Sequence, residues 1–297
     1  MMGDELRQGV EFGRNEASSG REVVTFHRRR ELAGVEIRSL KNSASAFRCY
    51  STDFELFAPI SWRGEIWHRR RQALIGPGTV LCARPGDVFF SQRVTTPGAA
   101  NFLAIDTRVF HEYLSDHSLA ARQMQLRAFT RISKRLEEKL QQVCRVVRPG
   151  PSALELQTAM VEFINALVPE LLESPSDSAT SLDATQRTAE RVRDCLHGDV
   201  SATVDLSTLA KHTGVSRFQV LRIFKLRYGL PPHTYQLNVR LAFARKALRA
   251  GQLPAEVAAQ YGFFDQSHLT RHFKRLLGVT PAQYARIGAR SRASRAD

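Results

Sequence analysis

The sequence of 297 residues contains few cysteines and no long hydrophobic run. Its four cysteines, Cys49, Cys82, Cys144 and Cys195, lie far apart and form no C-x-x-C pair, so neither a zinc site nor a disulfide framework is predicted. No apolar run approaches the roughly 18 residues that a membrane span requires. The N-terminus is polar and lacks the apolar core of a signal peptide. We therefore expect a cytoplasmic protein with no membrane partner.

The C-terminal third of the chain is poor in acidic residues. Residues 187–297 hold 19 of the 43 lysines and arginines but only 7 of the 29 acidic residues, in a chain of formal net charge +14. Such a local excess of positive charge is typical of a module that binds a polyanion. A basic surface that serves only solubility explains the charge equally well, so other features must decide.

The sequence also lacks the residue patterns of most enzymes. It contains no Ser/His/Asp arrangement, no phosphate-binding loop and no paired carboxylates. Metal binding near His111 and His117 is conceivable because acidic residues flank them, but a helix-end surface is the favoured interpretation. We predict no catalytic residue, no metal and no cofactor.

Residues 21–110 are rich in short β-branched and aromatic runs separated by Gly, Pro and Asn, which predicts an all-β sandwich or barrel. Residues 1–20 are expected to be disordered. The arginine runs 28–30 and 69–71 could bind an anion, although charged edges that discourage strand pairing are the favoured interpretation.

Residues 111–173 are predicted to be helical. Apolar residues between Phe129 and Val147 recur in steps of three and four and form one stripe along a helix. The stripe is either an interior face or a subunit contact of a homodimer. Residues 174–186, rich in Ser, Thr, Asp and Ala, are predicted to be a linker.

Four aromatic residues of the predicted barrel are candidates for the lining of a ligand pocket, because such pockets are mostly apolar and aromatic. They are Phe57, Trp62, Trp67 and Phe89. Packing in the core or in a hairpin is the alternative for the tryptophans, and it is favoured.

The C-terminal third contains a repeat. "FKLRYGLPPHTY", Phe224–Tyr235, returns 49 residues later as "FKRLLGVTPAQY", Phe273–Tyr284, and each copy follows a shorter helix and a glycine-containing turn. Each unit is therefore predicted to be a helix-turn-helix. A long helix from about His233 to Ala250 separates them by about 27 Å, which suits two neighbouring major grooves about 34 Å apart.

The outward faces of the second helices of both units carry no acidic residue and are rich in groups that suit base edges, phosphates and thymine methyls. A duplicated helical hairpin used only for packing is the alternative. The predicted DNA-binding residues are Arg217, Phe218, Leu221, Arg222 and Lys225 in the first unit and Gln266, Ser267, Thr270, Arg271 and Lys274 in the second.

Residues 187–287 resemble the DNA-binding domain of the AraC/XylS family of bacterial transcription regulators. The resemblance lies in "LAKHTGVSRFQVLRIFKLRYGLPPHTY", "RLAFARKAL" and "VAAQYGFFDQSHLTRHFKRLLGVTPAQY". It implies a double helix-turn-helix domain over residues 187–288, followed by a basic tail at 289–297. It adds His268 to the groove face of the second unit. Family members often carry a polar residue where Leu221 stands here, so base reading by the first unit is expected to depend on Arg222 and apolar contacts.

The N-terminal part is similar in domain order to the cupin-like effector and dimerisation domain of the same family, and it contains a "PGD" turn at 85–87. The barrel segment has only His27 and His68 and no His/Glu cluster, so a metal-binding cupin enzyme is not expected. The resemblance implies an α+β protein whose cupin-like barrel is followed by dimerisation helices and an all-α domain.

Its implied function is transcription regulation, usually activation, with double-stranded DNA, a small organic effector, RNA polymerase and a second copy of the chain as partners. Two alternatives remain: an architectural DNA-binding protein without an effector, and a DNA alkylation-repair enzyme. Repair would require clustered reactive cysteines, and the four cysteines here are scattered.

Overall fold

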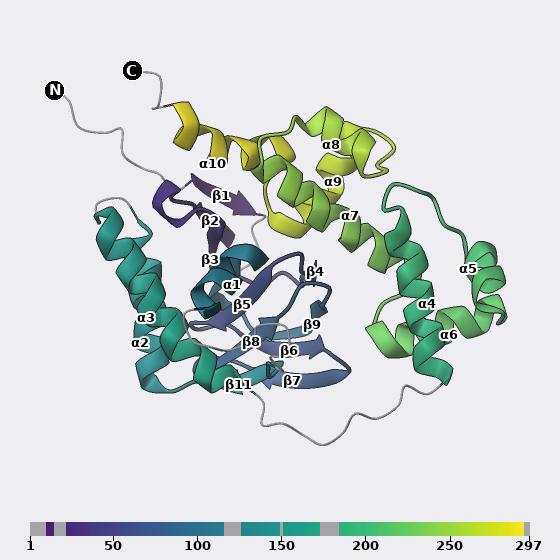
Figure 1. The fold of residues 1–297 in the computed structure, drawn as a ribbon, viewed down its shortest axis with the longest axis horizontal. Coiled ribbons are helices and arrows are strands. Elements are labelled where there is room, and N and C mark those ends of the chain that lie inside the picture. Colours follow the sequence, from purple (N-terminus) through teal and green to yellow (C-terminus); the bar gives the residue numbers. More distant parts are fainter. Residues whose placement is uncertain (1–9, 15–21, 116–125, 149–150, 173–183, 294–297) are drawn as a thin grey trace.

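The computed structural model describes residues 10–14, 22–115, 126–148, 151–172 and 184–293. Antiparallel strands come first and helices follow, so the chain has the predicted α+β organisation. Helices α2 and α3 lie along one side of the strands, and the C-terminal helices lie across the top and on the opposite side (Figure 1).

The strands form two antiparallel sheets, as the alternation of β-branched and turn-forming residues predicts. One sheet has seven strands in the order β1-β2-β3-β10-β5-β8-β11, and the other has four in the order β4-β9-β6-β7. The strands are β1 (Val10–Arg14), β2 (Glu22–His27), β3 (Val35–Ser43), β4 (Arg48–Tyr50), β5 (Phe54–Pro59), β6 (Arg63–His68), β7 (Arg71–Ile75), β8 (Thr79–Ala83), β9 (Val88–Thr96), β10 (Gly98–Ile105) and β11 (Phe129–Arg131).

The seven-stranded sheet is buried on both faces. Because successive side chains of a strand point to opposite faces, Phe57 of β5 joins the core that contains the inner side chains of both sheets, whereas Leu56 joins a second core. This second core contains side chains of α1 (Thr107–Ser115), α2 (Lys134–Val146) and α3 (Ala153–Leu171). Strand β5 is therefore buried at all six positions instead of alternating.

The apolar stripe between Phe129 and Val147 is an interior face of the chain. Leu136, Leu140 and Val143 of α2 are buried in the second core, which also contains the apolar face of α3. The predicted helix begins too early, because Phe129 belongs to β11 and Ser133 caps α2. The stripe is thus not available to a second subunit.

Three predicted boundaries differ from the structure. Part of the segment expected to be disordered, Val10–Arg14, forms β1 through backbone pairing with β2. The predicted linker ends earlier, because α4 begins at Ala184, and α10 continues to Ala293 inside the predicted tail. His117 and the rest of the linker, residues 174–183, lie outside the described residues.

The C-terminal domain consists of seven helices within residues 184–293. A short helix and a longer one form each repeat unit, and α7 joins the two units (Figure 1). The helices are α4 (Ala184–Gly198), α5 (Leu206–Thr213), α6 (Arg217–Tyr228), α7 (Pro232–Arg249), α8 (Pro254–Gln260), α9 (Gln266–Leu277) and α10 (Pro281–Ala293).

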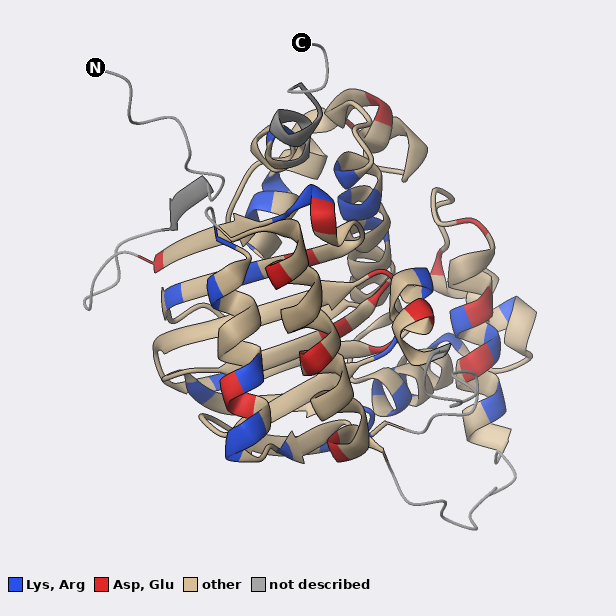
Figure 2. Cartoon of the chain, turned by 60° about the vertical axis from the view of Figure 1, so that its left-hand side comes forward, with Lys and Arg blue, Asp and Glu red and all other residues tan. Residues whose placement is uncertain are grey.

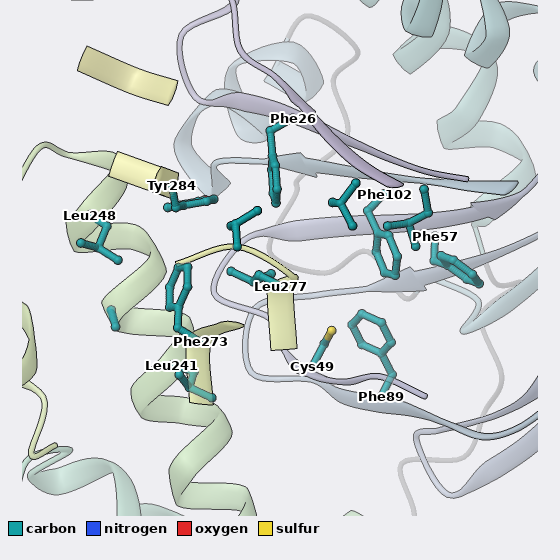
Figure 3. Close-up of a cluster of buried hydrophobic side chains, with 14 of the residues drawn as sticks. Phe26, Cys49, Phe57, Phe89, Phe102, Leu241, Leu248, Phe273, Leu277 and Tyr284 are labelled. Atoms are coloured by element: carbon teal, nitrogen blue, oxygen red, sulfur yellow. The ribbon is translucent and has the colours of Figure 1, made fainter. Parts of the chain in front are cut away.

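The two sheets together form the barrel of the N-terminal part. The C-terminal domain shares the hydrophobic core that lies between them. Figure 3 shows side chains of α7, α9 and α10 beside Phe26 of β2, and the same cluster extends to Phe57, Phe89 and Phe102 inside the barrel. The rings of Phe26 and Tyr284 meet edge to face, with centroids 5.4 Å apart. The two domains are therefore packed together rather than joined only by a linker.

Buried acidic residues of the barrel hold this interface. Figure 2 shows acidic positions within the sheet strands. Arg245 of α7 pairs with Glu55 of β5, and Arg249 Nη2 lies 3.1 Å from Asp53 Oδ2. The hydroxyl of Tyr284 donates a hydrogen bond of 2.8 Å to Glu36 Oε2. Burial opposes ionisation of Glu36, but Arg28, Arg245 and Arg249 outweigh it and lower its pKa to about 2.

Candidate nucleic-acid interface

The first helix-turn-helix unit is built from α5 and α6. Asp205 caps α5 by accepting a hydrogen bond from the backbone of Thr208. Gly214 ends α5 in the left-handed conformation, with φ of 75°, and Ser216 then caps α6 through a reciprocal capping box with Gln219. These caps fix where the exposed face of α6 begins.

The second unit is built from α8 and α9 in the same order. Asp265 caps α9 by accepting a hydrogen bond of 2.6 Å from the backbone of His268. Gly262 has a positive φ of 70° in the turn, and a Cβ there would lie 2.3 Å from the carbonyl oxygen of Ser201. Only glycine fits this approach of the turn to the loop before α5.

Both longer helices bury one side and expose the other. Val220 and Phe224 of α6 are fully buried, as are Leu269 and Phe273 of α9. The predicted DNA-binding side chains lie on the opposite sides. Nine of them, Arg217, Phe218, Leu221, Arg222, Lys225, Gln266, Ser267, Arg271 and Lys274, are exposed, and His268 and Thr270 are half-buried.

One residue that was not predicted from the sequence connects the two units. Arg240 of α7 donates to the carbonyl oxygens of Val200 and Ala202 before α5, at 2.8 and 2.9 Å. It also donates to the carbonyl oxygen of Gly262, at 2.8 Å. One guanidinium therefore joins the entry of the first unit to the turn of the second. The only sign in the sequence is a basic residue between Val239 and Leu241.

A second missed residue is Phe264, which immediately precedes the cap of α9. Its side chain is 92% exposed, and that of Phe218 on α6 is 86% exposed. Both rings are therefore accessible beside the predicted DNA-binding faces. An exposed phenylalanine thus lies close to the N-terminus of both α6 and α9.

The four aromatic candidates for a ligand pocket do not lie together. Trp62 and Phe57 pack edge to face with centroids 5.2 Å apart, and Phe89 belongs to the same buried cluster. Trp67 points to the other face of β6, where it stacks on Phe90 and lines a cavity beside α6. Of the two tryptophans, Trp62 therefore packs in the core, whereas Trp67 lies beside a cavity.

Within the described part of the chain, no group of three or more His, Cys, Asp or Glu side chains could hold a metal ion. Burial raises the pKa of Cys49 to about 11 and that of Cys82 and Cys144 to about 12. These thiols stay protonated at neutral pH and are poor nucleophiles. No described helix has the length and apolar character needed to cross a membrane.

Comparisons with known proteins agree with the geometry of the C-terminal domain. Residues 209–287 match the model of a helix-turn-helix domain family. A regulator of Bacillus subtilis, YbfI, is 36% identical over 111 residues, which are 36% of this chain and 40% of that protein. A putative AraC-like transcription regulator of Streptomyces lividans is 34% identical over 91 residues, 30% of each chain.

These matches span less than half the length of the two relatives. Among solved structures, ToxT of Vibrio cholerae aligns over 86% of this chain and 98% of its own, with 11% identity and a TM-score of 0.47. The exposed acid-free faces of α6 and α9, the duplicated caps and the family match coincide on the same residues. The C-terminal domain of this chain is a helix-turn-helix domain that is similar to those of AraC-like transcription regulators.

Proposed function

We propose that the chain is a sequence-specific transcription regulator that inserts α6 and α9 into two adjacent major grooves of DNA. The observation that carries this proposal is the pair of exposed reading faces, both without an acidic residue, in one domain. Helix α7 has 18 residues and spans about 27 Å. This length suits neighbouring grooves of slightly bent DNA.

The residues on these two faces differ in the part of DNA that each is suited to contact. Arg222, Arg271 and Gln266 present planar donors that suit guanine and adenine edges, whereas Lys225 and Lys274 suit phosphates. Phe218 and Phe264 are suited to thymine methyl groups and sugars. The opposite sides of α6 and α9 are buried in hydrophobic clusters formed with other helices of the domain and with the barrel, so the packed arrangement leaves the predicted DNA-binding faces accessible.

The remaining roles are proposed from the resemblance to the AraC/XylS family. The N-terminal domain responds to a small organic effector, and the regulator acts as an activator through RNA polymerase in the bacterial cytoplasm. The homodimer forms through α3, because Leu154 and Val161 of this helix are exposed whereas the stripe on α2 is buried. Leu136 and Leu140 of that stripe are buried in the interior.

Binding selection from randomised duplexes with the full-length protein tests the proposal. We expect a preferred sequence with two half-sites about one helical turn apart, and an affinity that falls steeply with salt as condensed counterions are released. Genome-wide mapping of bound DNA would then name the regulated genes. Equal affinity for selected and random duplexes would refute sequence-specific regulation and favour the architectural alternative.

A further inference from the structure

A cavity of about 360 Å³ lies between the barrel and the first helix-turn-helix unit. This volume is within the range of small-molecule sites. The barrel contributes Trp67 and Arg69 together with the turn from Arg84 to Val88, and the C-terminal domain contributes Arg193, Arg227 and Tyr228. The cavity therefore belongs to neither domain alone.

Positive charge dominates the lining. Four arginines face one carboxylate, Asp87, and that carboxylate is already occupied. Arg69 Nη2 lies 2.6 Å from Asp87 Oδ2, and the backbone N–H of Arg84 donates to the same oxygen at 2.8 Å. Arg193 pairs with its exposed neighbour Asp194 on α4. The cavity thus keeps an excess of cationic groups that its own acid does not neutralise.

Two buried donors in this lining have no hydrogen-bond partner among the described residues. They are Nε of Arg227 and the hydroxyl of Tyr228, consecutive residues at the end of α6. Leaving a buried polar group unpaired costs roughly 1–3 kcal/mol, so such groups usually mark a missing partner. Burial also raises the pKa of Tyr228, which keeps its hydroxyl protonated as a donor.

The turn that carries Arg69 is also unusual. Arg69 and Arg70 both adopt positive φ, 47° and 62°, at the tip of the hairpin between β6 and β7. Non-glycine residues rarely take this conformation, but a two-residue hairpin turn of type I′ requires positive φ at both central residues. The conformation places the guanidinium of Arg69 against Asp87 at the edge of the cavity.

We propose that this cavity binds a small organic or inorganic oxyanion, a carboxylate or a phosphate, as a hydrogen-bond acceptor for Arg227 and Tyr228. Arg84 and Arg193 supply further positive charge, and Trp67 forms the apolar wall. An anion held here contacts both the barrel and the last turn of the first reading helix. The role of this anion as effector rests on the proposed function, whereas its binding does not.

Intrinsic fluorescence of the full-length protein without DNA tests the proposal. Trp67 lines the cavity and Trp62 is buried in the barrel core, so an anion in the cavity perturbs one tryptophan selectively. We expect saturable changes with inorganic phosphate or with citrate, at an apparent Kd near or below about 1 mM. Sodium chloride at matched ionic strength should give no saturation. The phosphate and citrate arms distinguish the two anion classes.

Two variants and a control localise the site. Tyr228→Phe keeps the ring and removes only the unpaired hydroxyl, so it should remain folded and bind the anion about tenfold more weakly. Arg227→Gln should weaken binding at least as much. Arg145 is exposed on α2, so Arg145→Gln is the control and should leave anion binding unchanged. Trp67→Phe should abolish the fluorescence change while calorimetric binding persists.

Absence of saturation with both anions, or wild-type affinity in both Tyr228→Phe and Arg227→Gln, overturns the proposal. It is also overturned if these variants weaken DNA binding while neither anion shows saturable binding, because Arg227 and Tyr228 would then contact phosphates of DNA. Because the titration contains no DNA, its failure leaves the DNA-selection result intact. A failed DNA selection likewise leaves the anion result intact.

Discussion

Arg222 and Arg271 occupy equivalent positions of the repeat and are both exposed on the reading faces. An arginine in a major groove can donate two hydrogen bonds to guanine, which discriminates between bases by about 1–3 kcal/mol. Replacing either by alanine should therefore relax the base preference of its own half-site and leave the other unchanged. Binding selection from randomised DNA with each variant measures this effect, and an unaltered preferred sequence would show that these arginines hold only phosphates.

Lys225 and Lys274 provide the matched comparison, because they are exposed one turn farther along the same helices. A lysine that neutralises a phosphate contributes equally to all sequences. Lys225→Ala and Lys274→Ala should weaken binding to every duplex alike and reduce the slope of log affinity against log salt by about one. Titrations of specific and random duplexes at several salt concentrations check this expectation; a changed base preference would contradict it.

Glu36 is the residue whose charge most clearly affects stability. Its pKa falls from the ordinary 4.5 to about 2 in the fold, which corresponds to about 3 kcal/mol of stabilisation at neutral pH. Because the folded pKa is the lower one, this contribution is present above pH 4.5 and is lost as the pH falls towards 2. Glu36→Gln should destabilise the protein at pH 7 by about 3 kcal/mol.

Urea unfolding at pH 7 and at pH 3 measures this change. The difference between wild type and Glu36→Gln should shrink at pH 3, because the carboxyl of the unfolded wild-type chain, with its ordinary pKa of 4.5, is then mostly protonated. Tyr284→Phe removes a single hydrogen bond to Glu36, so it should cost less than Glu36→Gln at pH 7. A gap between wild type and Glu36→Gln that does not depend on pH would mean that the carboxyl is not held ionised by its arginines.

At the scale of elements, Arg240 of α7 holds the two reading units in a fixed relation. Its guanidinium donates to carbonyl oxygens of the loop before α5 and of the turn in the second unit. Arg240→Lys keeps the charge but cannot reproduce the fork of donors. It should lower the free energy of unfolding by about 2 kcal/mol and loosen the spacing between half-sites in binding selection. Arg286→Lys, exposed on α10, is the control and should change neither quantity.

Exposed residues of helix α3 allow the proposed homodimer to be tested. Leu154 is 73% exposed and Val161 is 42% exposed on its outer side. Leu154→Asp with Val161→Asp should convert a dimer into a folded monomer, as measured by light scattering with circular dichroism as the check of folding. Leu136→Asp should instead unfold the protein, because the side chain of Leu136 on α2 is buried in the core that α2 shares with α3. A monomeric wild type at micromolar concentration would contradict the assigned contact.

At the scale of the whole molecule, the barrel and the C-terminal domain share one hydrophobic cluster and several buried ion pairs. Separating them would expose Phe26, Phe273 and Tyr284 and leave charges unpaired. We therefore expect one calorimetric transition for the full-length chain. Leu277→Asp places a charge in the shared cluster and should split the transition in two. Two transitions in the wild type would show that the domains unfold independently.

The sequence alone predicted much of the DNA-binding domain, because the relevant signals are local. Asp205, Ser216 and the glycines at 214, 229 and 278 mark the helix ends through caps and left-handed turns that depend on few neighbours. The repeat then gave the two units and their reading faces. In the N-terminal part, the strand pattern predicted an all-β sandwich or barrel but not the pairing order of the strands.

Contacts between distant segments were decided only by the tertiary structure. An apolar stripe on α2 has the same sequence pattern whether it faces α3 or a second subunit. Buried Glu36, Asp53 and Glu55 read as ordinary charged strand residues until Tyr284, Arg249 and Arg245 are brought against them from some 190 to 250 positions away. Likewise the cavity beside Trp67 exists only because α6 packs on the barrel. Periodicity and capping report on the few residues around each position, whereas docking depends on which surfaces meet.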